Sequence, residues 1–196
     1  MRFQGWTLIM SKSFIQLTVM GMVVVFTTAC QTLDTVRLKN LKETELTKSN
    51  TLIYCSGTES CEFERLDSIK IIDENNHHLE KEAIRQGIVR LKGKSLKDSN
   101  PIYLSVPAKQ YELVIRFYPI SKDRAEKLHV IHNFKANQTY TFNMYRDRSR
   151  SNGSLLNVSA PEPLCVELKQ GKKTIRRFCK PYNVLNGLGE FVEKKI

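Results

Sequence analysis

The run of alternating apolar residues at Tyr111–Tyr118 constrains the fold of this chain more than any other feature. The segment reads Tyr-Glu-Leu-Val-Ile-Arg-Phe-Tyr. Successive side chains of a strand point to opposite faces, so the odd positions would form one continuous apolar face. The even positions are mixed. We therefore predict a strand with one face in the core and the other at least partly in contact with water.

Similar period-two runs alternate with turn residues from Thr51 onward, which is typical of antiparallel sheet. The further predicted strands are Leu52–Cys55, Leu66–Ile72, Ile88–Lys92, Ile102–Val106, Lys127–Phe134 and Thr139–Tyr145. Leu79–Gln86, followed by Gly87, is the best helix candidate. The sequence therefore predicts a mainly β fold: an antiparallel β-sandwich or open barrel with at most one or two short helices and a C-terminal disulfide-linked hairpin.

The first 29 residues contain no acidic side chain and end in an apolar run, Phe14–Ala29. A membrane span needs about 20 apolar residues, whereas the core of a signal peptide needs about 7–15. We predict a signal peptide over residues 1–29. Met10, followed by Lys12, offers a second start in ordinary signal proportions. The alternatives are an uncleaved anchor and an ordinary secreted protein.

The leader closes with Thr27-Thr28-Ala29-Cys30, which resembles the lipobox of bacterial lipoproteins. In that motif small residues precede a cysteine that is acylated and becomes the mature N-terminus. Thr27 stands where the family usually has an aliphatic residue. The resemblance implies lipidation of Cys30, and Gln31 in place of Asp implies delivery to the outer membrane. We expect the domain to face the periplasm, with exposure at the cell surface as the alternative. Two or three acyl chains would anchor the protein stably.

The chain has five cysteines, so lipidation of Cys30 would leave an even number: Cys55, Cys61, Cys165 and Cys179. Four cysteines allow three pairings. Local spacing favours Cys55 with Cys61 and Cys165 with Cys179. The second pair flanks a predicted hairpin that turns at Gly171–Lys173 and, paired symmetrically about Lys172, sets these two cysteines opposite each other. Disulfides agree with an oxidising periplasm. A zinc site is the alternative, but the Cys55-x5-Cys61 spacing is too wide for a zinc knuckle, and we expect no metal.

The predicted mature chain carries 29 basic and 20 acidic residues, because Arg2 and Lys12 leave with the leader, which gives a net charge of +9. The basic residues form two clusters along the sequence: Arg146, Arg148 and Arg150, and Lys172, Lys173, Arg176 and Arg177. An exported protein meets lipopolysaccharide phosphates, lipid headgroups and acidic polymers, so we expect no nucleic-acid partner. Solvated loop and hairpin faces are the alternative to an anion-binding surface.

Composition divides the mature chain into three parts. Residues 30–50 are polar and predict a flexible tether whose ends lie about 25 Å apart, with a short helix over Thr35–Leu46 as an option. Residues 51–148 form the predicted β-sandwich domain. Residues 149–196, after a break at Ser149–Gly153, form a C-terminal appendage that contains the cystine hairpin.

Two segments of the predicted sandwich, Val106–Ile115 and Phe134–Phe142, resemble the strand–turn patterns of PEGA-type and transthyretin-like β-sandwich modules. In those modules a V-P-x-G-x-Y-x-L-x-V hairpin precedes an x-A-G-x-x-Y-x-F strand. Lys109 and Asn137 stand where the modules have glycine, although Asn tolerates the left-handed conformation of such turns. The resemblance implies a non-enzymatic accessory module of envelope proteins and transfers no site residues.

The sequence lacks the common catalytic patterns. The segment from Gly87 to Gly93 places five residues between glycines where a phosphate-binding loop has four, and it reads as a strand. His129 and His132 would lie on opposite faces of a strand. His77 and His78 read as an exposed turn. No nucleophile elbow or zinc-protease helix is present. We therefore predict no catalytic residues and no cofactor.

The sequence favours a non-catalytic outer-membrane lipoprotein that supports or docks onto another envelope protein. The first alternative is a basic module that binds anionic envelope ligands such as lipopolysaccharide phosphates. The second alternative is a small periplasmic hydrolase, which would need a deep polar pocket.

Overall fold

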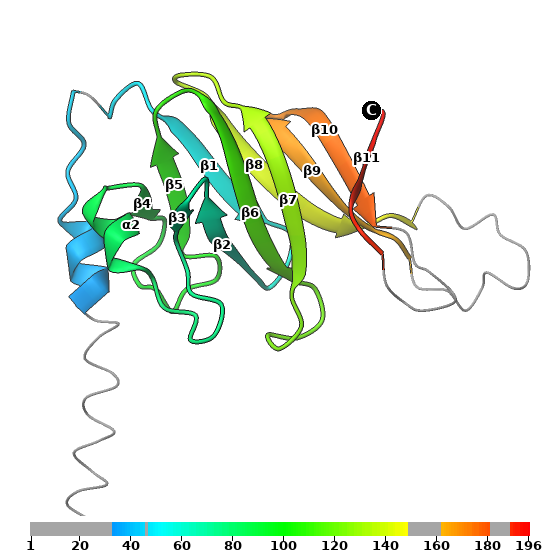
Figure 1. Cartoon of the computed structure of the whole chain (residues 1–196), viewed down its shortest axis with the longest axis horizontal. Coiled ribbons are helices and arrows are strands. Elements are labelled where there is room, and N and C mark those ends of the chain that lie inside the picture. The colour runs from blue at the N-terminus through cyan, green and yellow to red at the C-terminus, as the bar shows by residue number, and fades with distance from the viewer. Residues whose placement is uncertain (1–32, 46, 149–161, 181–188) are drawn as a thin grey trace, which may run out of the picture.

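The computed structural model describes residues 33–45, 47–148, 162–180 and 189–196, and these residues form two β-sheets (Figure 1). The seven-stranded sheet has the order β11 (Val192–Lys194), β10 (Lys173–Lys180), β9 (Leu164–Gln170), β8 (Thr139–Arg146), β1 (Thr51–Ser56), β5 (Ile102–Val106) and β4 (Val89–Leu91). The four-stranded sheet has the order β3 (Ile69–Lys70), β2 (Ser60–Leu66), β6 (Gln110–Tyr118) and β7 (Glu126–Asn133). The mainly β sandwich expected from the sequence is therefore confirmed.

The core lies between the two sheets. The odd positions of β6 fill it, since Leu113, Ile115 and Phe117 are fully buried. Phe142 of β8 and Ile53 of β1 are buried on the facing sheet. The odd positions of β6 thus form the core face that the period-two pattern predicts.

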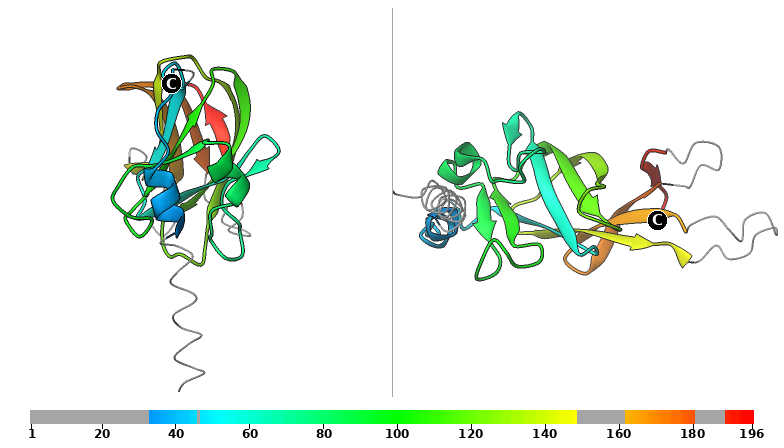
Figure 2. Two further views of the ribbon diagram at one scale, coloured as in Figure 1. Left: turned by 90° about the vertical axis from the view of Figure 1, so that its left-hand side faces the viewer. Right: turned by 90° about the horizontal axis from the view of Figure 1, so that it is seen from below.

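Two short helices accompany the sheets: one over residues 33–39 and α2 (Lys81–Arg85). Both lie at the end of the sandwich near β4 and β5 (Figures 1 and 2). α2 was expected as Leu79–Gln86 and is shorter at both ends. Gly87 follows it with φ +68, a left-handed conformation that suits glycine after a helix.

One strand pair corrects the expectation of an all-antiparallel fold. β1 and β8 are parallel neighbours in the large sheet, with Leu52 opposite Thr139 and Ser56 opposite Asn143. A parallel pair needs a long crossover connection, and here all of β2 to β7 lies between the partners. The turn before β8 places Asn137 at φ +56, the left-handed conformation expected of it.

The predicted strand Leu66–Ile72 is wrong. The chain instead forms β2 before it, turns after Leu66 with Asp67 at φ +49, and continues as the two-residue β3. β2 departs from the period-two pattern because of a register shift between Phe63 and Arg65, so its last two buried residues, Phe63 and Leu66, are three positions apart instead of two.

Both expected disulfides are present. Cys55 of β1 and Cys61 of β2 are joined, so this bridge ties the large sheet to the small one. Cys165 of β9 and Cys179 of β10 lie opposite each other within the large sheet. Their register confirms the symmetric hairpin, although a bulge between Thr174 and Arg176 shifts the pairing by one residue near the turn.

Residues 33–50 differ from the flexible tether that their composition predicted. Leu38 of the first helix is 3% exposed and belongs to the core cluster. Arg90 donates a hydrogen bond from Nη1 to the carbonyl oxygen of Leu41 at 3.1 Å. Because the helix and the residues after it pack on the domain, the segment cannot extend freely from it.

The C-terminal strands also differ from the separate appendage that was expected. β9 pairs with β8 along seven residue pairs, from Tyr140 with Gln170 to Arg146 with Leu164. The cystine hairpin therefore continues the large sheet. The expected break at Ser149–Gly153 lies outside the described residues.

Candidate functional site

A cluster of buried and half-buried polar side chains lies on the outer face of the small sheet. The sequence predicted that this face of β6 is at least partly wet, but Val114, Arg116 and Tyr118 are all buried. The segment after β3 folds over them: the carbonyl oxygens of Ile72 and Asp73 each accept a hydrogen bond from Arg116 Nη2 at 3.3 Å. Both faces of β6 are therefore covered.

Arg116 is the centre of this cluster, with a side chain that is 2% exposed. Its Nη2 lies 3.1 Å from Glu62 Oε2, and its Nε lies 3.6 Å from Glu64 Oε2. Both glutamates project from β2 beside it, because Glu62 is the register partner of Arg116. A buried guanidinium needs such carboxylates, since an uncompensated charge in the interior is strongly unfavourable.

The Glu62 carboxylate also binds two groups from other directions. Tyr118 Oη donates a hydrogen bond to Oε2 at 2.8 Å, and Nδ1 of His77 lies 3.1 Å from both oxygens. Burial and the hydrogen bond to Glu62 raise the pKa of Tyr118 well above its ordinary range, so its hydroxyl remains a proton donor. His77 reaches the carboxylate from a turn where its own φ is +56.

A second ion-pair group borders the first. Lys127 of β7 lies 3.3 Å from Glu64 Oε2 and 2.7 Å from Glu74 Oε1. The hydrogen bond from Lys127 lowers the pKa of Glu74, and the same bond raises the pKa of Lys127. The segment over the sheet is thus held by charges at both Arg116 and Lys127.

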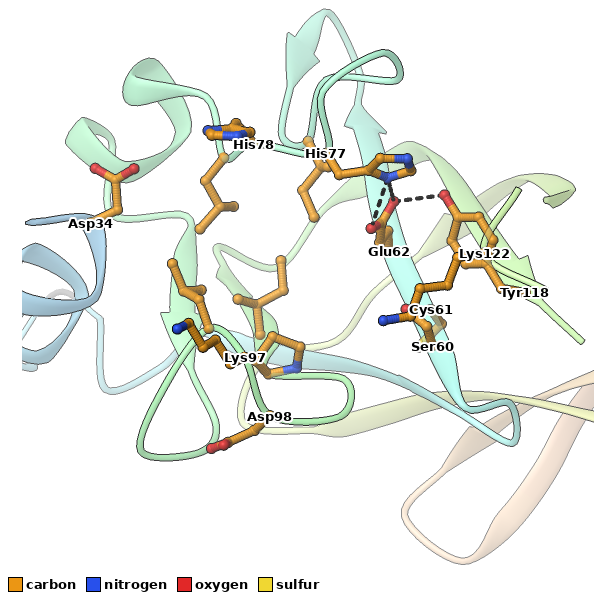
Figure 3. A pocket seen from close by; sticks show the side chains of 15 residues that line it. Asp34, Ser60, Cys61, Glu62, His77, His78, Lys97, Asp98, Tyr118 and Lys122 are labelled. Atoms are coloured by element: carbon orange, nitrogen blue, oxygen red, sulfur yellow. Dashed lines mark hydrogen bonds and ion pairs between the residues drawn. The ribbon is translucent and has the colours of Figure 1, made fainter. Parts of the chain in front are cut away.

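A groove of about 440 Å³ opens beside Glu62 (Figure 3). Its polar lining comes from several elements: Asp34 of the first helix, Ser60 of β2, His77 and His78 of the turn, Lys97 and Asp98 of the loop before β5, and Lys122 after β6. Tyr118 and Asp34 lie on opposite sides of it (Figure 3). The hydrolase alternative would require a deep polar pocket, and this groove is the place on the described surface where we look for one.

The groove offers a carboxylate–imidazole pair, Glu62 with His77, of the kind that orients a general base. Ser60 also lines the groove, but Figure 3 shows its side chain well separated from His77. The Glu62 oxygens are instead engaged by Arg116, Tyr118 and His77, an arrangement that stabilises the covering segment.

The histidines behave largely as expected. His129 is exposed on β7 while His132 faces the core side, so the two cannot share a metal. His78 is exposed, but the contact of His77 with Glu62 was missed. Within the described ranges, no three His, Cys, Asp or Glu side chains form a group that could hold a metal.

The basic residues expected to bind anions do not come together. Arg146 lies opposite Leu164 at the start of β9, whereas Lys173 lies opposite Gln170 at its end. Leu164 and Gln170 are the two ends of β9 and lie six positions apart along the strand, which is about 20 Å. Lys172 and Lys173 are exposed at the hairpin turn. Arg150 lies outside the described residues.

The other arginines of the two clusters have carboxylate partners. Arg177 Nη2 lies 2.8 Å from Glu167, and Arg148 Nε lies 3.4 Å from Glu162. Arg176 Nε lies 2.7 Å from Glu193, and this bond lowers the pKa of the Glu193 carboxyl. These pairs neutralise much of the charge that the sequence clusters suggested.

Sequence reasoning missed the Arg116 cluster because it missed β2. The available signal was the mixed face of β6, where Arg116 and Tyr118 share one side with Val114. Glu62 and Glu64 could be placed beside them only with the register of β2 known.

No known protein family, curated protein sequence or solved structure matches this chain. Among the described residues, no helix is long and apolar enough to cross a membrane.

Proposed function

We propose that this chain is a lipid-anchored, non-catalytic module of the bacterial cell envelope, which is held by acyl chains on Cys30 and supports or docks onto another envelope protein. The observation that carries the proposal is the pairing of the cysteines. Cys55 bonds to Cys61 and Cys165 bonds to Cys179, so these four cysteines are used among themselves. Cys30, at the end of the lipobox-like segment, is the fifth.

The two bridges support an oxidising compartment, and both are buried. Cys55, Cys61 and Cys165 are at most 2% exposed, and Cys179 is 8% exposed. Such bridges persist in the periplasm and are rare in the cytosol. The bridges and the leader are independent features of the chain, and both favour export.

The non-catalytic part of the proposal rests on the Arg116 cluster. Its charged groups bind each other across β2, β6 and the covering segment, with Glu62 contacted by three partners. A catalytic carboxylate would need at least one oxygen available to substrate. The cluster is therefore better suited to holding a loop on a sheet than to proton transfer.

The basic residues of the C-terminal hairpin do not favour the first alternative, which is the binding of anionic envelope ligands. Only two exposed lysines, Lys172 and Lys173, lie at the hairpin turn among the described residues. The nearby arginines, Arg176 and Arg177, pair with glutamates. We therefore do not extend the proposal to lipopolysaccharide recognition by these residues.

Metabolic labelling with an alkyne fatty acid tests the proposal. The full-length wild-type protein should be labelled and should remain with the membrane fraction after washing at high salt. Cys30→Ser should lose the label while the two disulfides still form. A wild-type protein that carries no label would overturn the lipid-anchored assignment.

A further inference from the structure

We propose that the outward face of the helix over residues 33–39 docks onto the anionic phospholipid surface into which the acyl chains of Cys30 insert. This inference rests on the proposed lipidation and adds to it an orientation: the domain lies against the bilayer by a defined surface. We call Leu33, Val36, Arg37 and Lys39 the docking face.

The helix carries apolar residues on two opposite sides. Leu38 faces the domain and is 3% exposed, whereas Leu33 is 57% exposed and Val36 is 54% exposed. Residues three apart lie on one side of a helix, so Leu33 and Val36 share the side away from Leu38. The domain explains the burial of Leu38 but leaves the other apolar pair without a partner among the described residues.

The position of the helix supports this orientation. In the left view of Figure 2 the helix lies in front of the strands, at the end of the sandwich, and no other described element covers it. Its outer side is therefore open to a large, flat partner.

The covalent chain brings this face to the membrane. Only three peptide units separate Cys30 from Leu33, so their Cα atoms cannot lie more than about 11 Å apart. Acyl chains on Cys30 would thus hold Leu33 close to the headgroups. A free tether of 20 residues would allow any orientation, but Leu38 and the Arg90–Leu41 hydrogen bond fix the segment on the domain.

The charges beside the apolar pair fit an anionic lipid surface. Arg37 has a 55% exposed side chain, and Lys39 is exposed on the other flank. Such side chains can lay their stems along apolar surface and place their charge among lipid phosphates. The one carboxylate of the helix, Asp34, is 17% exposed and pairs with Arg37 at 3.3 Å.

A second copy of the chain is the competing occupant of this face. A stable dimer buries about 800 Å² on each partner, which two apolar side chains cannot supply. The short covalent link to the anchored residue favours the bilayer, and self-association becomes an outcome of the test.

Tryptophan fluorescence provides the experiment, because Trp6, in the leader, is the chain's single tryptophan. Val36→Trp is placed on the docking face. The matched control is Ile131→Trp, on β7, where the native side chain is 58% exposed. Both substitutions replace exposed apolar residues, so neither should prevent folding. The acylated proteins, purified from membranes, are reconstituted into vesicles of phosphatidylethanolamine and phosphatidylglycerol with brominated acyl chains.

The proposal predicts that the emission of Val36→Trp shifts to shorter wavelength and is quenched by the bromines, because an interfacial helix face lies about 5–10 Å into the headgroup–acyl boundary. The emission of Ile131→Trp should show neither change. Acylated Val36→Trp protein that is not quenched, or equal quenching in both variants, overturns the docking and leaves the anchor intact. An emission shift of Val36→Trp that occurs equally without lipid indicates self-association and also overturns it. Protein without acyl chains by mass spectrometry overturns both proposals.

Discussion

The guanidinium of Arg116 lies 3.1 Å from the carboxylate of Glu62 beneath a surface segment, with side chains that are 2% and 16% exposed. The two residues come from neighbouring strands of the small sheet and are register partners. Their pairing holds the segment after β3 on the sheet, since Arg116 also donates to Ile72 and Asp73. The stability of the domain should therefore depend on this pair.

Glu62→Gln should lower the free energy of unfolding by about 3 kcal/mol, because removal of one partner leaves a buried guanidinium poorly compensated. Glu64 remains 3.6 Å from Arg116 and keeps the loss near the lower end of the usual range. Urea denaturation measures the change. Glu112→Gln is the matched control: its pair with Arg65 is partly exposed, so its loss should be under about 1 kcal/mol. Equal losses in both variants would contradict the role of the buried pair.

The two disulfides should contribute unequally to the stability of the protein and to the cooperativity of its unfolding. In the chain-entropy model, replacing Cys55 and Cys61 together by alanine costs about 2.4 kcal/mol, and replacing Cys165 and Cys179 together costs about 3 kcal/mol. The first pair of substitutions also removes the disulfide that links the two sheets, whereas the second leaves the β9–β10 hydrogen bonds in place. Thermal unfolding of the first variant should therefore be less cooperative. A fully cooperative transition at the wild-type temperature would contradict this view of the bridge.

Acidification should destabilise the protein through His132. Its Nε2 is buried without a hydrogen-bond partner in the described structure, and its ring packs against Phe134 and Tyr140. Burial, assisted by the charge of Arg176, holds the pKa of His132 below its ordinary value of 6.5. As the pH falls below 6.5, the unfolded chain binds a proton that the folded chain resists, so the stability present above that pH is progressively lost.

The His132 effect is measured as the difference in unfolding free energy between pH values above and below 6.5. His132→Phe should reduce that difference, because phenylalanine cannot be protonated. The control is His129→Phe on the exposed side of β7, which should keep the wild-type difference. An unchanged pH dependence in His132→Phe would rule out this histidine as the cause.

Gly57→Ala should destabilise the protein strongly, because the backbone of β8 leaves no room for a side chain at this position. Gly57 has φ +93, and an added Cβ would lie 2.0 Å from the carbonyl oxygen of Met144, which is backbone and cannot move aside cheaply. Gly171→Ala is the control, because Gly171 also has a positive φ but meets nothing within 4 Å. Its cost should be about 1–2 kcal/mol. Urea denaturation compares the two variants, and a smaller loss for Gly57→Ala than for Gly171→Ala would show that this corner of the fold is less tightly packed than described.

Leu38→Ala should release the helix over residues 33–39 from the domain. A buried leucine truncated to alanine costs about 2–5 kcal/mol, and here much of that cost falls on the docking of one helix. Hydrogen exchange should become faster in this helix while α2 retains its protection. Val36→Ala, at an exposed position, should leave exchange unchanged. Equal and rapid exchange in the wild type and Leu38→Ala would restore the free-tether interpretation.

Local features of the sequence were sufficient for part of this fold. The core-facing odd positions of β6 and the bounds of β5 follow from the period-two pattern. The Cys165–Cys179 bridge follows from the symmetry of one hairpin, where the partners are 14 residues apart. These features are encoded by neighbours in the chain.

Features that depend on distant segments were not predictable. The bulge in β2 breaks the period-two pattern by which a strand is recognised in a sequence. The parallel pairing of β1 with β8 depends on the path of all the strands between them, which no local pattern encodes. The burial of Arg116 depends on a polar segment folding over the sheet, and polar composition alone suggests the opposite. In the same way, residues 33–50 pack on the domain through Leu38 and Leu41, although the polar composition of the segment suggests a free tether.

The mass of the N-terminal peptide of the native protein, extracted from cell envelopes, decides whether this chain is a lipid-anchored module. Lipid anchoring predicts a peptide that begins at Cys30 and carries two or three acyl chains, with Cys55 joined to Cys61 in the same digest. A peptide that begins upstream of Cys30, or a Cys30 with a free thiol in the membrane-extracted protein, would contradict it.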